Sequence, residues 1–539
     1  MPSILYYISF LFPILYKYSY VITNQYTQIP IILSYMNREY LLNDWYVNLG
    51  RDFGPRTIFA VYSAFWGKLI GLPITYFVHY LLTGGIFILA TYRMALLLFK
   101  NRKAAILTAI TILFGATYSI GGNLLITSDF TVTQLSLSIS LLAIVLILEE
   151  RYFLSSILFA VSSYFHPQIG PESALLAYFS TALTFILTDR KILNKKMAVL
   201  IKKAILPYLI FVMPLLIFYL KSSQAEISTS LKINIIAFVR TPHHFLPAYF
   251  PLSHYLAFFI VLICGFIILR KLRENKNSEL YLFISFFTLF TFFITVISLT
   301  ALYSKTFYPL VILQPFRLTV YIYWFMALTV IGAIFLAILK NKIQPVFSFV
   351  PLFLSDYSRL IQFNKVNTAA IILGLIIVFY FKKIPFKALT VLILIFFSLF
   401  HFHEKFNYGS YYQHPVPEVE LAQWAKNNTT KNDIFLIPPE FEKFRLISER
   451  PVVADWKSFP FQEKGYYEWY LRMCDLGNQS VCDSKNLSQD KVTSGFRTHT
   501  LQSLVDLGRK YQAKYAVSEV DYPELKKLYS NFYQVYMLP

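Results

Sequence analysis

The sequence predicts a mainly α-helical, polytopic membrane protein with about 12–13 transmembrane helices and a small C-terminal soluble α/β domain. Hydrophobic residues make up 56% of the 539 residues and charged residues only 14%, whereas soluble globular proteins contain about 25% charged residues. Apolar runs close to the roughly 20 residues that cross a bilayer recur up to residue 402. We therefore divide the chain into a transmembrane domain, 1–402, and a soluble domain, 403–539.

The net charge of +20 belongs to the membrane part of the chain. Residues 402–539 contain 17 Lys and Arg and 17 Asp and Glu, which leaves 32 basic and 12 acidic residues for 1–401. The cations cluster in short connectors between apolar runs, as the positive-inside rule expects of cytoplasmic loops. This distribution argues against a nucleic-acid partner and for a membrane lipid surface.

The expected membrane segments can be placed in order along the chain. They lie at 3–22, 74–99, 104–122, 133–148, 153–165, 172–188, 204–220, 254–269, 279–302, 319–339, 367–381 and 387–402. The first run has no basic n-region and no small-residue cleavage site, which is typical of a retained helix and not of a signal peptide. Its residues are therefore counted as the first transmembrane helix.

The basic connectors set the expected sidedness in a plasma (inner) membrane. We assign to the cytoplasm the connectors around 100–103, 151, 190–203, 270–276, 340–342 and 382–387. The extracytoplasmic connectors are then 23–73, 123–132, 166–171, 221–253 and 303–318. If the short run 345–354 also crosses, there are thirteen helices and the tail is outside; if it does not, there are twelve and the tail is inside. The basic loop at 382–387 favours the tail outside.

The first outside loop, 23–73, is long and mixes aromatic, apolar and charged residues, which indicates amphipathic helices on the membrane surface. In the soluble tail, VPEVELAQWAKNN, EKGYYEWYLRMC, LQSLVDLGRKY and YPELKKLYSN are typical of helices. DIFLIPP, RPVVADW, KYAVSEV and YQVYML are typical of strands, so we expect a mostly parallel sheet. No Gly-rich phosphate loop follows a strand. Cys474 and Cys482 form either a local disulfide or two free thiols.

Acidic residues are scarce in the membrane domain and are functional candidates for that reason. Those expected outside are Glu39, Asp44, Asp52, Asp129, Glu172 and Glu226. Asp44 is the catalytic candidate, as a general base toward a sugar hydroxyl or as a ligand of a divalent ion. Asp52 and Asp129 are secondary candidates. The structural alternatives are a surface charge pairing with Arg38, Arg51 or Arg56 for the first two and a helix N-cap for Asp129.

The external histidines and arginines point to phosphate chemistry. Arg240, His243 and His244 lie together in VRTPHHFLPAYFP, where the arginine suits a phosphate and a histidine a proton donor. His166 ends a helix and Arg317 begins one on the same side. The alternatives are loop packing at the interface and, for Arg317, snorkelling. Adjacent histidines do not share a helix face, so no metal site is predicted.

The layout resembles that of GT-C fold glycosyltransferases, which use lipid-phosphate-linked sugars. The shared features are a first helix, a long outside loop with an acidic residue (NDWYVNLGRDFGPR), about a dozen helices, His and Arg in external loops, and a closing α/β domain. The resemblance implies a polyprenyl-phosphate sugar donor, Asp44 as catalytic residue, and Arg240, His243, His244 and Arg317 at the lipid phosphate. Members often carry two adjacent acids in this loop; here Asn43 precedes Asp44, which leaves a divalent metal an open question.

Two other functions stay open at this point. A lipid or polysaccharide transporter or flippase would be expected to show related halves with interrupted helices, and no such symmetry is evident. A non-catalytic envelope protein would depend on its tail binding a partner, without Asp44 or Arg240. Fold-level resemblance does not decide among them.

Overall fold

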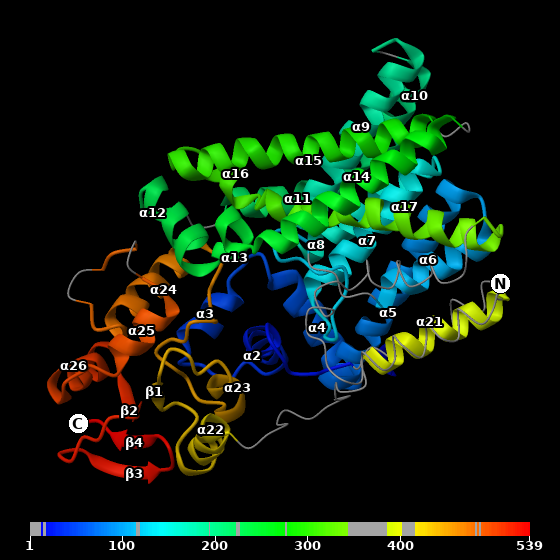
Figure 1. The fold of residues 1–539 in the computed structure, drawn as a ribbon. Helices are drawn as coiled ribbons and strands as arrows, with labels where there is room; N and C mark the ends of the chain where they lie inside the picture. The colour runs from blue at the N-terminus through cyan, green and yellow to red at the C-terminus, as the bar shows by residue number, and fades with distance from the viewer. Residues whose placement is uncertain are drawn as a thin grey trace. The chain divides into compact units, whose positions relative to one another are not determined.

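A computed structural model describes residues 12–14, 18–114, 119–192, 194–221, 227–274, 278–342, 385–400, 416–479, 482–484 and 487–539. It confirms a mainly helical chain with a small C-terminal sheet (Figure 1). Among the described residues, six helices are long and apolar enough to cross a membrane, and four apolar helices are shorter. Most of the expected segment 3–22, and all of 345–354 and 367–381, lie outside the described residues, as does the boundary at 402.

The chain forms two compact units, each assembled from separate segments. The helical unit comprises Met1–Ser19, Tyr76–Pro214 and His243–Asn407. The mixed unit comprises Tyr20–Thr75, Leu215–Pro242 and Tyr408–Pro539. The first outside loop thus belongs to the same unit as the tail, whereas the sequence prediction divided the chain once, at residue 402. Composition shows where a chain changes character but not which distant segments pack together.

The helical unit contains long apolar helices together with several short helical elements. They are α5 (Leu72–Phe99), α6 (Arg102–Phe114), α7 (Val132–Leu148), α8 (Tyr152–Phe165), α9 (Ile169–Asp189), α10 (Lys195–Leu200), the π-helix η1 (Ile201–Ile205), α11 (Leu206–Lys221), α13 (Pro242–Phe245), η3 (Pro247–Tyr249), α14 (Leu252–Glu274), α15 (Ser278–Ser304), α16 (Tyr308–Ile312), η4 (Pro315–Leu318), α17 (Thr319–Leu339) and α21 (Phe386–Phe400). Of these, α5, α11 and α13 also extend into the mixed unit. Helices α7, α8 and α9 pack on one another, α15 packs on α9, and α6 and α14 pack on α17.

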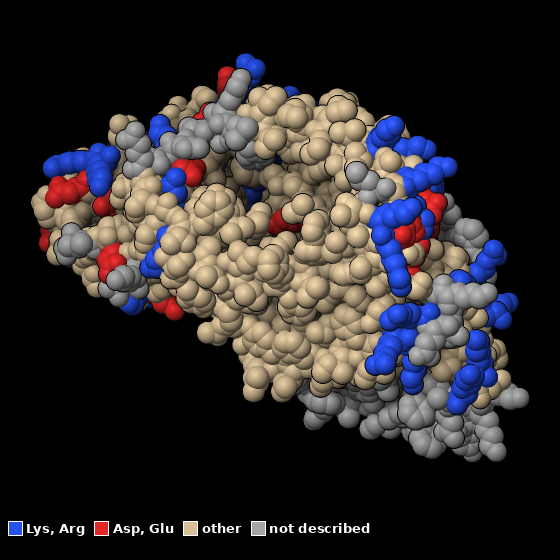
Figure 2. Space-filling model, turned by 90° about the horizontal axis from the view of Figure 1, so that it is seen from above, with Lys and Arg blue, Asp and Glu red and all other residues tan. Residues whose placement is uncertain are grey.

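Basic side chains of the helical unit gather at one end of its helices (Figure 2). This end holds the α5–α6 and α9–α10 turns and the C-terminal ends of α14 and α17. The residues are Lys100, Arg102, Lys103, Arg190, Lys191, Lys195, Arg270, Lys271, Arg273, Lys340 and Lys342. These connectors are among the ones that the sequence assigns to the cytoplasm, so most of the basic connectors lie together at one end of the helical unit.

The mixed unit begins with α2 (Gln25–Met36), α3 (Trp45–Arg51) and α4 (Thr57–Ile70), followed by α12 (Thr229–Ile233) and the π-helix η2 (Asn234–Arg240). On α4, Val61, Phe65 and Leu69 are exposed and follow one another at intervals of four residues. This apolar stripe suits a helix that lies on a membrane surface, as expected for the first outside loop.

The tail contributes α22 (Pro417–Asn428), β1 (Ile434–Leu436), α23 (Phe444–Ser448), α24 (Glu463–Leu476), α25 (Gln489–Phe496), α26 (Leu501–Tyr511), β2 (Ala513–Ser518), β3 (Lys526–Ser530) and β4 (Gln534–Met537). The strand order is β1-β2-β4-β3. Only β1 and β2 pair in parallel, while β2–β4 and β3–β4 are antiparallel. The expectation of a mostly parallel sheet is therefore wrong, because the last strands are joined by a short turn instead of a helix.

Two elements of the tail differ from the sequence prediction. YPELKKLYSN, expected as a helix, contains strand β3, because pairing with β4 outweighs the helix-like spacing of its apolar residues. RPVVADW, expected as a strand, makes only one bridge, between Val452 and Phe435. Cys474 and Cys482 form a disulfide bond with their Cα atoms 5.4 Å apart. Of the two alternatives left open for this pair, the structure has the disulfide.

Candidate functional site

Several of the predicted site residues meet in the helical unit, around the turn at 119–123. His244 Nδ1 lies 2.8 Å from the carbonyl oxygen of Gly121. Arg317 Nε donates to Asn123 Oδ1 at 3.0 Å, and Asn123 Nδ2 donates back to the Arg317 carbonyl at 3.3 Å. The structure thus brings the His243–His244 segment and Arg317 to one turn, although they are far apart in sequence.

Glycine makes this close approach feasible. Gly121 has a φ of +102°, and a Cβ there would lie 2.4 Å from the carbonyl carbon of Phe316. Gly122 has a φ of +74° and faces the backbone of His243 and the ring of His244. Since L-residues with side chains rarely adopt such φ values, the turn can pass between Arg317 and the histidines only with glycine at these positions.

The guanidinium of Arg317 is held by neutral groups. Besides Asn123, its Nη1 donates to Gln314 Oε1 at 3.1 Å and to Gln168 Oε1 at 3.4 Å. Among the described residues, no carboxylate lies within ion-pair distance of Arg317. Three amide oxygens orient the cation without neutralising it, which leaves its charge available to an anion.

His166 takes part indirectly. It ends α8, and its Nδ1 accepts a hydrogen bond from the Ile169 backbone N–H at 3.3 Å. This contact closes the turn from which Gln168 reaches Arg317. The rings of His243 and His244 have centroids 4.1 Å apart, and the ring of Tyr249 lies 5.7 Å from that of His243. No group of three metal-ligating side chains occurs within the described ranges.

Glu172 is the residue of this cluster that the sequence counted among the outside acids but to which it assigned no role at the site. It lies in the first turn of α9, one turn after Gln168, and only 6% of its surface is exposed. It interacts electrostatically with Arg317 without forming an ion pair. The available signal was an acid in the first turn of an otherwise apolar run, IGPESALLAYFSTALTF.

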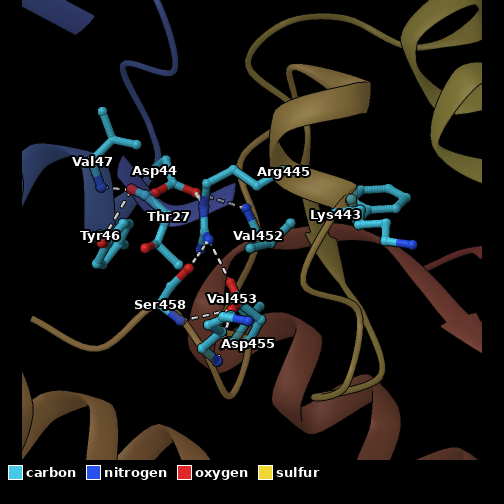
Figure 3. A network of polar contacts seen from close by, with 12 residues as sticks. Thr27, Asp44, Tyr46, Val47, Lys443, Arg445, Val452, Val453, Asp455 and Ser458 are labelled. Carbon is cyan, nitrogen blue, oxygen red and sulfur yellow. Dashed lines mark hydrogen bonds and ion pairs between the residues drawn. The ribbon is translucent and has the colours of Figure 1, made fainter. Parts of the chain in front are cut away.

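Asp44 belongs to the mixed unit, where it is fully buried in a polar network (Figure 3). It caps α3: its Oδ1 accepts from the Val47 N–H at 2.9 Å. Its Oδ2 accepts from Arg445 Nε at 2.8 Å and from the Val452 N–H at 3.1 Å. The partner of Asp44 is therefore Arg445 in the tail, and not one of the arginines of its own loop.

Arg445 connects two carboxylates. Its Nη1 pairs with Asp455 and contacts the hydroxyl of Ser458, while Asp455 also accepts from the Ser458 N–H at 2.8 Å. Burial disfavours the charged form of Arg445, but the carboxylates of Asp44 and Asp455 outweigh it and raise the pKa of Arg445 above its ordinary value. The network joins the first loop to the tail inside one unit.

Arg240, also in the mixed unit, has a different environment. Its Nη2 donates to the Lys457 carbonyl at 3.2 Å, and its guanidinium carbon lies 5.7 Å from the centre of the Phe459 ring. Arg56 stacks similarly on Phe461, at 4.6 Å. Burial and the nearby charge of Arg56 lower the pKa of Arg240 to about 10. Within the described part of the chain, neither arginine forms an ion pair.

The secondary candidates Asp52 and Asp129 differ in burial. Asp52 is exposed and follows α3 as its C-cap. Asp129 is buried, with 4% of its surface exposed. The expectation that Asp129 caps the next helix is wrong, because Thr131 takes that position and accepts from the Gln134 N–H.

Comparisons with known proteins cover the tail and the whole chain separately. A family model described as a domain of unknown function, DUF6798, matches residues 416–476. No curated protein sequence matches the chain. Among solved structures, the chain is similar to the apo oligosaccharyltransferase of Archaeoglobus fulgidus, with 12% identity, a TM-score of 0.49, and 96% of this chain and 69% of that chain covered.

A second similar structure is that of ArnT from Cupriavidus metallidurans bound to undecaprenyl phosphate. The identity is 10% and the TM-score 0.44, with 99% of this chain and 96% of that chain covered. These are similarities in the course of the chain. The Arg317 cluster and the Asp44 network are defined by contacts within this chain and not by these similarities.

Proposed function

We propose that this chain transfers a sugar from a polyprenyl-phosphate donor at the outer face of the membrane, and that Arg317 binds the phosphate of that donor. The observation that carries the proposal is a partly buried guanidinium whose hydrogen bonds all go to neutral groups and which forms no ion pair among the described residues. A cation in an apolar helical unit is costly unless an anion accompanies it. A phosphate accepts charge-assisted hydrogen bonds from a guanidinium and supplies the missing charge.

The position of Arg317 along α17 supports the outer face. Arg317 precedes this helix, and Lys340 and Lys342 follow it. A helix of 21 residues is about 31 Å long, close to the roughly 30 Å thickness of the hydrocarbon core. If the basic end is cytoplasmic, Arg317 therefore lies near the opposite headgroups, where the phosphate of a lipid-linked sugar would be.

The histidines and the tail add further support. His243 and His244, at the turn next to Arg317, supply ring nitrogens that can hydrogen-bond to phosphate or transfer a proton. The disulfide between Cys474 and Cys482 suits an extracytoplasmic tail, because disulfides persist in oxidising compartments. Arg240, with no ion-pair partner among the described residues, is a second proposed anion contact in the mixed unit. Asp44 as catalytic residue stays a prediction.

The test is lipid binding by the full chain in nanodiscs, with polyprenyl phosphate as probe and polyprenol, which lacks the phosphate, as matched ligand. We expect wild type to bind the phosphate and not the alcohol, and Arg317→Gln to weaken binding at least about tenfold, the loss of one charge-assisted contact. Arg317→Lys keeps the charge but lacks the planar guanidinium, so its affinity for polyprenyl phosphate should lie between those of wild type and Arg317→Gln. Arg102→Gln, at the exposed basic end, is the control.

Equal binding of both lipids by wild type, or full binding by Arg317→Gln, would contradict the proposal. Phosphate binding followed by movement of the lipid across the bilayer, without transfer of any sugar, would instead establish a flippase.

A further inference from the structure

We infer that Glu172 is the catalytic carboxylate that takes the proton from the acceptor hydroxyl, next to the donor phosphate on Arg317. The inference rests on the proposed function and assigns its general base. It differs from the expectation for Asp44, because Glu172 lies in the helical unit, together with Arg317 and the histidines.

Two contacts between α9 and the start of α17 determine where Glu172 lies. On one side, Gln168 reaches Arg317 at 3.4 Å. On the other side, the hydroxyls of Ser173 and Tyr321 touch. Glu172 follows Gln168 by four residues, and its N–H donates to the Gln168 carbonyl at 3.2 Å, so both side chains share one helix face. This face looks toward the segment that carries Arg317.

The hydrogen bonding of Glu172 is incomplete. Its Oε1 is buried, yet it accepts no hydrogen bond from any described residue. Arg317 does not donate to this oxygen, and its Nε and Nη1 groups donate to amide oxygens of Asn123, Gln168 and Gln314. Buried polar atoms are rarely left without a partner, and such an atom in a native structure calls for an explanation. A substrate hydroxyl would be the missing donor.

The chemistry of the two groups is complementary. The acceptor oxygen attacks C1 of the donor sugar, and the bond between C1 and the phosphate oxygen breaks. The electron pair of this bond leaves with the polyprenyl phosphate, whose charge Arg317 stabilises. The hydroxyl proton passes to Glu172 Oε1. Atoms and charge balance without a further reactant, since one glycosidic bond replaces one phosphoester bond.

The arrangement also explains why the two charges do not form an ion pair. A direct contact between Glu172 and Arg317 would neutralise both groups and would occupy the positions needed for hydroxyl and phosphate. Arg317 instead donates to the amide of Gln168, so the guanidinium and the carboxylate can each contact a different part of the substrates.

The experiment uses the full chain in proteoliposomes with polyprenyl-phosphate-linked radiolabelled hexose, and envelope lipid and polysaccharide extract as acceptor. For Glu172→Gln we expect transfer to fall about 100-fold or more, the usual contribution of a general base, while polyprenyl phosphate binds as tightly as to wild type or more tightly. Glu172→Asp should recover part of the rate. Glu279→Gln, which removes an exposed acid at the basic end, should transfer normally.

The outcomes separate this inference from the proposed function. Wild-type transfer by Glu172→Gln, with Arg317→Gln inactive, would overturn the role of Glu172 and leave the phosphate site intact. Loss of phosphate binding in both Glu172→Gln and Glu172→Asp would show a structural role and overturn it as well. The proposed function, and the inference with it, would be overturned if the wild-type chain neither binds polyprenyl phosphate nor releases it from the sugar donor.

Discussion

Two buried carboxylates, Asp44 in the mixed unit and Glu172 in the helical unit, have opposite surroundings. Asp44 accepts from two backbone N–H groups and from the guanidinium of Arg445, and both of its oxygens are used. Glu172 has an oxygen with no donor among the described residues. A carboxylate whose bonding is complete stabilises the fold, whereas one whose bonding is incomplete is ready for a ligand.

The two arginines next to these carboxylates repeat the contrast. Arg445 is 1% exposed and is paired with two acids, so its charge is neutralised inside its own unit. Arg317 donates hydrogen bonds to amide oxygens, and within the described residues no ion pair neutralises its charge. We conclude that the Arg445 network joins the first loop to the tail and that the Arg317 cluster is the place for chemistry.

The largest expected effect on stability comes from removing the cation of the network. Arg445→Met leaves the buried carboxylates of Asp44 and Asp455 without their cation, and breaking a buried ion pair costs about 3–5 kcal/mol. We expect this loss in the free energy of unfolding of the mixed unit, followed by chemical denaturation in detergent. A variant as stable as wild type would show that the network does not hold the loop to the tail.

Asp44→Asn should have a smaller effect, because asparagine also caps helices well and keeps the shape of the side chain. What is lost is the charge-assisted bond to Arg445, worth about 1.5–3 kcal/mol. The check is a double-mutant cycle with Arg445→Met, in which the two losses should be clearly less than additive. Fully additive losses would mean that the two residues do not act together.

The disulfide gives a comparable effect within the tail. Replacing Cys474 and Cys482 by serine opens a loop whose ends are eight residues apart, and loop entropy predicts a loss of about 2–3 kcal/mol. Thermal unfolding of the double variant, compared with wild type under reducing and oxidising conditions, checks this prediction. Only wild type should respond to the reductant.

The smallest effect concerns pH. Burial, together with the charge of Glu442, raises the pKa of Glu418 to about 7, although Lys443 acts in the other direction. The folded state therefore binds a proton that the unfolded state releases near pH 4.5, so stability should fall as the pH rises from about 4.5 to 7. Solvent screening limits the total to about 1 kcal/mol. Glu418→Gln should flatten this part of the pH profile.

Much of the fold was predictable because its signals are local. Apolar runs predicted the long helices α5, α9, α14, α15 and α17. The basic connectors predicted that one end of these helices carries basic side chains. Pairing between distant segments was not predictable: 401 residues separate Asp44 from Arg445. For the same reason β3 was expected as a helix, since only its pairing with β4 makes it a strand.

The candidate site was predictable in part. Scarcity of charge identified Arg317, His243 and His244, and these residues do meet at the turn formed by Gly121 and Gly122. The scarcity of acidic residues could not show whether Asp44 or Glu172 is the better catalytic candidate. The two differ in which neighbours donate hydrogen bonds to them, and these neighbours come from other segments of the chain.

The most direct test of this contrast is the rate of hexose transfer per folded molecule for Asp44→Asn and Glu172→Gln, measured side by side at a temperature where both remain folded. We expect the transfer rate of Glu172→Gln to fall about 100-fold or more and that of Asp44→Asn to stay within about threefold of wild type. The opposite pattern, with Asp44→Asn inactive and Glu172→Gln active, would contradict this expectation and would make Asp44 the catalytic carboxylate.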